Sequence, residues 1–447
     1  MNLHRMLGAR AEEGRPVGVG LIGAGKFGTM FLTQARLTTG LNITGIADLD
    51  VNRAQGSCAL AGWPAEQTVI GDLAAADNSG PTTIGENAEA LINNPAVEVI
   101  IDATGHPAAG IQHCLKAIEA GKHVVMVNVE ADVVAGPLLA RKAREAGVVY
   151  SLAWGDQPAL ICEHVDWARA CGFKVVCAGK GTRYLPQYHG LTPESVWDVL
   201  KIYLKVDENS DINPKMFNSF LDGTKSGIEM TAVCNATGLV PQADGLKFPP
   251  ASRFELADVC KPQSAGGQLS ADGTTECVSS LYRDGSDVPH NLVMGTYVVF
   301  EGETDYAREC FSQYHMLQDE SDRYAALYRP IHMIGLELGL SVASAALRGE
   351  PTGAPICFNS DVVATAKRPL KAGEVLDGEG GYMVWGQQMP ASTSLQLGGL
   401  PLGLAQGVKV AHDISEGARL TWSDVVIDEA DAAVKVRREM EAAFGAH

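Results

Sequence analysis

The sequence predicts an α/β protein with three parts: an N-terminal doubly wound parallel sheet, an α+β domain, and a C-terminal, mostly-β domain. Short apolar runs alternate with helical patterns over residues 1–156, which is typical of a parallel sheet covered by helices. Residues 157–330 open with a helix-like run, DQPALICEHVDWARACGF, and a strand, KVVCAGKGT. Residues 355–447 contain short strand-like runs between the turn sequences LKAGE, DGEGG and SEGA.

The bulk composition limits the class of protein. Hydrophobic residues make up 46% of the 447 residues and charged residues 20%, as in a globular protein with more than one core. The net charge of −18 disfavours a nucleic acid partner, because phosphate neutralisation needs clustered Lys and Arg. We expect no secretory signal and no membrane span, since the longest uncharged stretch is rich in Gly, Pro, Gln and Ser. The ten cysteines are scattered without a CxxC pair, which favours reduced thiols and a cytoplasmic protein.

A glycine-rich turn follows the first strand. The apolar run VGVGLI leads into the GxGxxG sequence GAGKFG and then into a helical pattern. The first two glycines permit a tight turn and a close approach of pyrophosphate, and the third allows close packing of helix and strand. The sequence therefore predicts a Rossmann dinucleotide-binding site. Its expected loop contacts are Gly23, Gly25, Lys26, Phe27 and Gly28.

The second strand, NITGIAD, ends at Asp48, twenty residues after Gly28. An acid at this place normally binds the ribose hydroxyls, which favours NAD. Arg53 lies five residues further on, and it either reaches the 2′-phosphate of NADP or is an ordinary solvated helix residue. These residues alone leave the choice between NAD and NADP open.

Later strands place more polar groups at the same edge. The run VEVIIDATG ends at Thr104 and Gly105, and another strand ends at Asn128. Because ligands lie at the carboxyl ends of parallel strands, we expect these residues on the nicotinamide side of the crevice. Residues 62–87 break the rhythm and predict an insertion or a long loop. A helix at about 331–349 is expected to return to this domain.

The central region contains two groups of candidate binding residues. Lys180 and Arg183 lie beside glycines in GKGTR, which suits either an anion site or an ordinary basic loop. Residues 310–339 concentrate hydrogen-bonding and cationic groups, and one carboxylate of 318–322 is a possible hard-metal ligand in a run expected to be mostly solvated. The candidates from this second group are Tyr314, His315, Arg329 and His332.

The stretch FNSFLDGTKSGIEM carries three charges in an otherwise apolar segment. If 218–236 is one helix, Asp222, Lys225 and Glu229 lie on one face, within roughly 60° of each other. We interpret this face as part of a cleft, where a lysine beside two carboxylates binds a substrate oxygen, moves a proton or helps to anchor a metal. The alternative is a buried set of ion pairs that stabilises the helix.

Six motifs together resemble the homoserine-dehydrogenase-like superfamily, and within it the deoxyxylulose-phosphate-reductoisomerase-like (DRL) branch. They are VGVGLIGAGKFG, DATGHP, GDQPAL, AGKGTRYLP, FNSFLDGTKSGIEM and YRPIHMIGLELGLSV. The resemblance implies an enzyme that depends on NADPH and on Mg²⁺ or Mn²⁺. Its expected reaction converts 1-deoxy-D-xylulose 5-phosphate to 2-C-methyl-D-erythritol 4-phosphate in non-mevalonate isoprenoid biosynthesis. The alternative is an NAD(P)-dependent dehydrogenase of the same fold that acts on a hydroxy acid or sugar acid.

The sequence departs from true homoserine dehydrogenases. Asn128 is followed by Val129 and Glu130, where those enzymes have an Asn-Lys pair, and their GxDxxRK signature is missing from the sequence. Both departures argue against homoserine as the substrate. Lys225 stands in the segment that matches their GTTNY motif, which has no lysine.

The resemblance also implies roles for the central residues. Lys180 and Arg183, with Arg329, are expected to bind the substrate phosphate. Lys225 is expected to stabilise charge on a substrate oxygen or to shuttle a proton. Asp222 and Glu229 are expected to orient Lys225 or to bind the metal.

The C-terminal region resembles a SAF-type β-clip domain, on the phrases AKRPLKAGEVL and GARLTWSDV. Lys367, Arg368 and Lys371 either cover a substrate or belong to a structural or oligomer-forming module. An amphipathic helix is expected near the end of the chain, over 427–445. The family implies a homodimer. A non-catalytic NADPH sensor is a third reading, which the charged face of FNSFLDGTKSGIEM disfavours.

Overall fold

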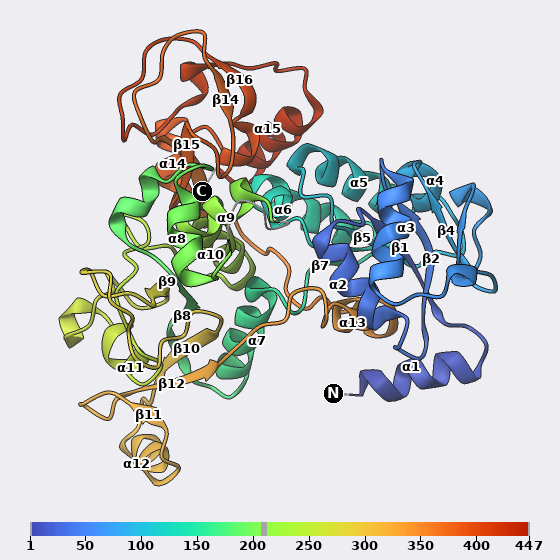
Figure 1. Cartoon of the computed structure of the whole chain (residues 1–447). Coiled ribbons are helices and arrows are strands. Elements are labelled where there is room, and N and C mark those ends of the chain that lie inside the picture. Colours follow the sequence, from blue (N-terminus) through green and yellow to red (C-terminus); the bar gives the residue numbers. More distant parts are fainter. Residues whose placement is uncertain (1, 207–211, 446–447) are drawn as a thin grey trace. The chain divides into compact units, whose positions relative to one another are not determined.

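The computed structural model describes residues 2–206 and 212–445, and within them the chain forms two compact units (Figure 1). Unit 1 consists of Met1–Leu160 and Met333–Ile356, and unit 2 of Ile161–His332 and Cys357–His447. The sequence predicts a separate domain over 355–447, and Cys357–His447 lie in the same unit as the central region.

Unit 1 is built on a parallel sheet with the strand order β3-β4-β2-β1-β5-β6-β7 in the described part of the chain. Its strands are β1 (Val17–Ile22), β2 (Leu41–Ala47), β3 (Thr68–Ile70), β4 (Thr82–Gly85), β5 (Val99–Asp102), β6 (His123–Met126) and β7 (Tyr150–Leu152). Every paired strand in it runs parallel to its neighbour. All six residues of β1 are buried, as expected for a strand with helices on both faces. The predicted doubly wound sheet is confirmed.

The helices of unit 1 connect these strands. They are α1 (Leu3–Glu12), α2 (Lys26–Ala35), α3 (Val51–Leu60), α4 (Ala88–Ile92), α5 (Pro107–Glu119), α6 (Val129–Glu145) and α13 (Gly339–Arg348). The returning helix expected from residue 331 begins only at Gly339. Leu338, Val342 and Ala343 belong to the same buried cluster as Val19 and Leu21 of β1, so this helix completes the core of unit 1.

Residues 62–87, for which the sequence predicts an insertion or a long loop, contain two strands of this sheet and are not a long loop. Strand β4 lies in this segment and pairs in parallel with β2, with Thr83 opposite Gly45, and β3 pairs in turn with β4. The strand sequences TVI and TTIG have three and four residues and lie among Gly, Ala, Asp and Pro. Runs this short give no measurable periodicity.

Unit 2 contains a mixed sheet with the strand order β11-β12-β10-β8-β9 among the described residues. Its strands are β8 (Lys174–Thr182), β9 (Thr274–Ser279), β10 (Thr296–Glu301), β11 (Leu317–Gln318) and β12 (Tyr324–Arg329). Helix α7 (Gln157–Ala170) and helix α10 (Thr224–Thr237) share a buried cluster with Val298 and Phe300 on one face. The remaining helices here are α8 (Val196–Tyr203), α9 (Pro214–Leu221), α11 (Leu256–Val259) and α12 (Asp305–Gln313).

The expected single helix over 218–236 was also wrong. Helix α9 ends at Leu221 and α10 begins at Thr224. Gly223 between them has φ +89°, a left-handed conformation that favours glycine and that interrupts a right-handed helix. Asp222 therefore lies in a turn, and it does not share one helix face with Lys225 and Glu229.

The C-terminal part of unit 2 contains two small sheets, β13-β15 and β14-β16-β17, in the described region. Its elements are β13 (Ser360–Ala366), β14 (Val375–Asp377), β15 (Val384–Pro390), α14 (Ala391–Leu397), β16 (Gln406–Val410), β17 (Val425–Val426) and α15 (Ala432–Phe444). Helix α10 packs against β13 and β15. The fully buried Arg437 of α15 bonds to Asp361 of β13 at 2.5 and 3.1 Å, which anchors the last helix.

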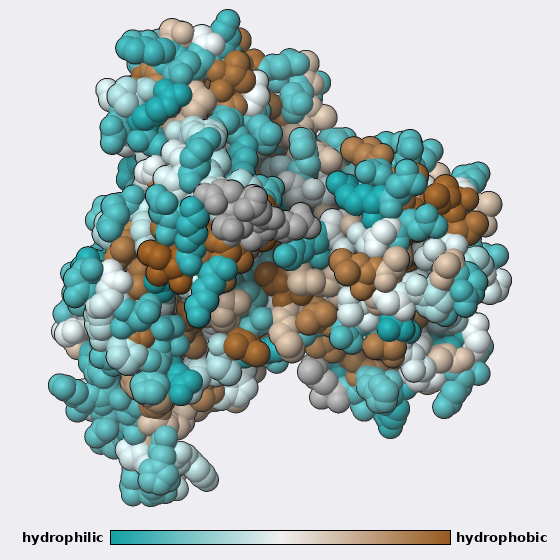
Figure 2. Space-filling view, in the orientation of Figure 1, coloured by the Kyte–Doolittle hydropathy of each residue, from teal (hydrophilic) through white to brown (hydrophobic). Residues whose placement is uncertain are grey.

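The visible surface is predominantly polar. Figure 2 shows hydrophobic residues in separate patches among hydrophilic ones. In the part of the chain that the structure describes, the helices are too short or too polar to cross a bilayer.

Candidate functional site

The glycine loop of unit 1 requires glycine at two of its three positions. Gly23 has φ +93°, and a Cβ there would lie 2.8 Å from the carbonyl oxygen of Ala103. A Cβ on Gly28 would lie 2.6 Å from the carbonyl oxygen of Gly23, whereas Gly25 faces open space. Helix α2 begins directly after Gly25 without a side-chain cap, with Lys26 exposed in its first turn. Its first N–H groups therefore suit a phosphate, so the loop fits a dinucleotide.

Asp48, directly after β2, braces this loop. Its Oδ2 atom accepts the N–H of Ala24 at 2.8 Å, and Oδ1 accepts the N–H of Asp50 at 2.9 Å. Arg53 donates to Oδ1 at 2.6 Å while its own side chain is 59% exposed. Phe27 is partly buried against the core of the unit. The guanidinium of Arg53 is thus held beside the loop and open to solvent.

A buried carboxylate that the sequence interpretation missed organises the other end of this edge. Asp102, the last residue of β5, is fully buried, and its Oδ1 accepts from Thr104 Oγ1 at 2.8 Å and from Asn128 Nδ2 at 3.3 Å. Its Oδ2 lies 2.7 Å from His113 Nδ1. Gly105 has φ +65° and faces open space. The neighbouring ends of β5 and β6 thus bring together Thr104, Gly105 and Asn128. The acid that ends VEVIID was the signal for Asp102.

In unit 2, Lys180 of β8 and Glu229 of α10 form a buried ion pair. Their side chains are 5% and 2% exposed. The partner of Glu229 is therefore a lysine on the sheet. Lys225, half-buried, lies in the first turn of the same helix.

Three neighbouring strands bring further polar residues beside this pair. Thr296 of β10 lies opposite Lys180 on one side and Arg329 on the other, so the three side chains share the sheet face covered by α7 and α10. His164 of α7 approaches Thr296 Oγ1 through Nε2 at 3.0 Å. Burial, with a smaller contribution from Arg329, lowers the pKa of His164 to about 4, so the imidazole is neutral at pH 7. The sequence interpretation missed His164, which looked like one polar position of an amphipathic helix.

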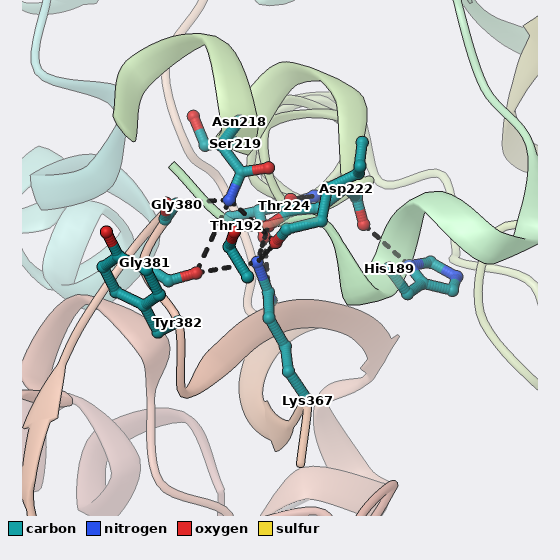
Figure 3. A network of polar contacts seen from close by, with 12 residues as sticks. His189, Thr192, Asn218, Ser219, Asp222, Thr224, Lys367, Gly380, Gly381 and Tyr382 are labelled. Atoms are coloured by element: carbon teal, nitrogen blue, oxygen red, sulfur yellow. Dashed lines mark hydrogen bonds and ion pairs between the residues drawn. The ribbon is translucent and has the colours of Figure 1, made fainter. Parts of the chain in front are cut away.

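The turn between α9 and α10 holds a second buried ion pair (Figure 3). Asp222 Oδ1 accepts the N–H of Thr224 at 2.9 Å, and Oδ2 lies 2.7 Å from Lys367 Nζ. The side chains of Asp222 and Lys367 are 0% and 2% exposed. His189 donates from Nδ1 to the carbonyl oxygen of Asp222 at 2.7 Å. Lys367 therefore contacts this turn, and its burial leaves it unable to cover a substrate.

His189 belongs to an aromatic chain. It accepts the hydroxyl of Tyr184 at Nε2 (2.8 Å), because Nδ1 carries the proton donated to Asp222. Its ring stacks on Trp385 and the ring of Tyr184 stacks on Phe248, each at 3.8 Å between centroids. Burial lowers the pKa of His189 and raises the pKa of Tyr184 to about 12. Both groups are therefore neutral at pH 7.

The predicted metal ligands do not fit a cation in this structure. Asp222 and Glu229 are each neutralised by a buried lysine, so a metal would have to displace an ammonium group. Among the described residues, His, Cys, Asp and Glu side chains form no group of three or more suited to a metal. Asp319 of the acidic run is buried, bonds to Lys261 at 2.7 Å and accepts the N–H of Tyr324, so it stabilises the fold.

The remaining predicted binding residues are dispersed. Arg183 pairs with Asp287 at 2.7 Å and lies over the ring of Tyr203. His332 Nδ1 approaches the carbonyl oxygen of Met294 at 2.7 Å. Tyr314 and His315 follow α12 before the edge strand β11 and are exposed. Because β12 and β10 separate β11 from β8, the structure does not join these last two to the Lys180–Glu229 pair.

Two family models match the chain. Residues 155–338 match the catalytic domain of oxidoreductase DRL, and residues 18–152 match the NAD-binding domain of homoserine dehydrogenase. Together they support an oxidoreductase of the DRL and homoserine-dehydrogenase-like group that binds a nicotinamide cofactor.

Individual relatives are more distant. The chain is similar to 1-deoxy-D-xylulose 5-phosphate reductoisomerase from Pseudomonas syringae pv. syringae (strain B728a), with 32% identity over 133 residues. That match covers 28% of this chain and 33% of the relative, so the chain spans about a third of that protein.

Two solved structures show low similarity. The reductoisomerase from Zymomonas mobilis in complex with NADPH is 18% identical, with 49% of this chain and 58% of that one covered and a TM-score of 0.33. Dihydrodipicolinate reductase from Paenisporosarcina sp. TG-14 is 12% identical, with 75% and 97% covered and a TM-score of 0.35. At these scores neither structure supports a functional conclusion.

Proposed function

We propose that the protein is an NADPH-dependent reductoisomerase that converts 1-deoxy-D-xylulose 5-phosphate to 2-C-methyl-D-erythritol 4-phosphate. The main support is the buried Lys180–Glu229 pair, with His164 and Arg329 beside it, inside the segment that matches the DRL catalytic domain. Strongly desolvated charges beside a neutral histidine are typical of sites that move protons. The partial similarity to the reductoisomerase from Pseudomonas syringae pv. syringae agrees with this reaction.

NADPH is the proposed cofactor because of the way Asp48 and Arg53 interact. Both carboxylate oxygens of Asp48 already accept protein N–H groups, which leaves them poorly suited to the ribose hydroxyls. Arg53 is exposed and its charge suits a 2′-phosphate. The bound nicotinamide supplies a hydride. The nicotinamide ring would contact Thr104, Gly105 and Asn128.

The residues of unit 2 would handle the substrate. Arg329, on the same sheet face as Lys180, would bind the phosphate of the ketose, since arginine binds planar and tetrahedral oxyanions through several N–H groups. The skeletal rearrangement produces an aldehyde, which then accepts the hydride and one proton. Lys225 would stabilise charge on the reacting oxygen or deliver that proton. Lys180 is paired with Glu229 and would not bind the phosphate. Its charge would instead contribute to the electrostatic potential at the site.

The family resemblance implies Mg²⁺ or Mn²⁺, but Asp222 and Glu229 do not fit that role. We also propose a cytoplasmic homodimer that acts on a small phosphorylated sugar.

A simple NAD(P)-dependent dehydrogenase for a hydroxy acid or sugar acid is the second candidate. It is favoured by the limited match, which spans only 33% of the reductoisomerase. Growth of a bacterium lacking its own reductoisomerase distinguishes the two. Rescue by this chain supports the first proposal, whereas failure of a well-folded protein together with NADP⁺ reduction by sugar acids supports the second.

A further inference from the structure

One lysine from the C-terminal part of unit 2 is buried against the turn that precedes α10. Lys367, directly after β13, has a side chain that is 2% exposed. Besides its ion pair with Asp222 at 2.7 Å, its Nζ donates to the carbonyl oxygens of Leu191 (2.8 Å) and Gly381 (3.0 Å) (Figure 3). Two carbonyl oxygens accept hydrogen bonds from this ammonium and the carboxylate of Asp222 neutralises it, so the fold fixes the position of this charge.

Asp222 transmits this constraint to the start of α10. Its Oδ1 atom accepts the N–H of Thr224, the first residue of α10, at 2.9 Å, while Lys367 neutralises its other oxygen. Strand β15 also contacts Thr224, because the N–H of Gly386 donates to Thr224 Oγ1 at 2.8 Å. Trp385 of the same strand stacks on His189, which bonds to the carbonyl oxygen of Asp222. The C-terminal segment thus contacts the Asp222 turn through Lys367 and through strand β15.

We infer that Lys367 is a positioning residue of the candidate site, and that the C-terminal segment is an integral part of the catalytic unit. Lys367 fixes the start of α10, and α10 then carries Lys225 and Glu229 at their required places. The catalytic consequence rests on the proposed function, whereas the structural consequence does not.

Two variants separate positioning from folding. In Lys367→Met, Asp222 is left as a buried unpaired charge, so we expect a lower melting temperature and a kcat reduced at least tenfold. In the double variant Asp222→Asn/Lys367→Met no charge is buried alone and the amide oxygen still accepts the N–H of Thr224. We expect its melting temperature to recover towards the wild-type value while kcat stays at least tenfold low. NADPH binding should be unchanged in both.

Lys409→Met is the matched control, because Lys409 of β16 is an exposed lysine of the same segment. Its kcat should stay within twofold of the wild type. The inference is overturned if Lys367→Met behaves like this control, or if the double variant recovers both stability and kcat.

Amide hydrogen exchange of the full wild-type chain with NADPH is a test that needs neither a variant nor a substrate. We expect the amide of Thr224 to be as protected as those in the middle of α10. Exchange more than a hundredfold faster would indicate a frayed helix start and would overturn the inference. If the wild type does not convert 1-deoxy-D-xylulose 5-phosphate, that result contradicts only the proposed function. The hydrogen exchange of Thr224 then still tests the structural role inferred for Lys367.

Discussion

The ammonium of Lys180 on β8 and the carboxylate of Glu229 on α10 are ion-paired at the buried contact between sheet and helix. This pair explains how a charged residue is accommodated in a helix whose other residues are almost all buried. A second lysine, Lys367, does the same for Asp222. Each acid of FNSFLDGTKSGIEM therefore has a distant basic partner, and Lys225 lies in the first turn of α10.

Breaking the Lys180–Glu229 pair should destabilise the protein strongly. Glu229→Gln leaves Lys180 as a buried unpaired charge, and such changes cost about 3–5 kcal/mol of unfolding free energy. Chemical denaturation measures this. Glu89→Gln is the control, because Glu89 pairs with Lys116 at the surface and should change stability by less than about 1 kcal/mol. Equal effects of the two variants would contradict the burial argument.

Gly223→Ala should cost more stability than Gly238→Ala. Both glycines have positive φ, +89° and +75°, so alanine suffers about 1–2 kcal/mol of backbone strain at either position. Only at Gly223 would the new Cβ also meet a neighbour closely, with the His189 ring at 3.2 Å. Gly238 has open space. Thermal unfolding of the two variants isolates this contact, and an equal loss would show that the ring simply moves aside.

The fold was predictable wherever the pattern is local. Apolar runs predict the strands VGVGLI and KVVCAGKGT, and the glycines predict the loop GAGKFG. The break at Gly223 was visible only as one glycine in an otherwise helical pattern, which is ambiguous. The partners of Asp222 and Glu229 could not be predicted, because ion pairs between segments far apart in the chain depend on tertiary packing.

Arg53→Ala should weaken binding of NADPH but not of NADH. A charged hydrogen bond to a phosphate contributes about 1.5–3 kcal/mol, so we expect the KM for NADPH to rise roughly tenfold or more. The KM for NADH should change by less than twofold. Arg15→Ala, which removes an exposed pair with Glu13 in the same unit, is the control. Parallel losses for both cofactors would mean that Arg53 acts through Asp48 and not on a 2′-phosphate.

Asp132 of α6 should make stability depend on pH. It is fully buried, it accepts the hydroxyl of Tyr150 at 2.7 Å, and its Oδ2 has no hydrogen-bond partner among the described residues. Burial raises its pKa to about 7, so the folded state keeps a proton that the unfolded chain releases from about pH 4 upwards. The stability that this proton contributes is full below the unfolded pKa and is lost as pH rises through 7.

Asp132→Asn removes this dependence. The unfolding free energy of the wild type should therefore fall relative to the variant between pH 5 and pH 8, by at most about 3 kcal/mol. Denaturant midpoints across that range measure the difference. A difference that stays constant with pH would show that Asp132 is already ionised in the folded protein.

The central claim is that this oxidoreductase rearranges a carbon skeleton before it reduces it. The direct measurement is the product formed by the purified protein from 1-deoxy-D-xylulose 5-phosphate and NADPH, identified by NMR and mass spectrometry. We predict one NADPH oxidised for each 2-C-methyl-D-erythritol 4-phosphate formed. An unrearranged, straight-chain polyol phosphate, or no oxidation of NADPH by a folded protein, would contradict the account.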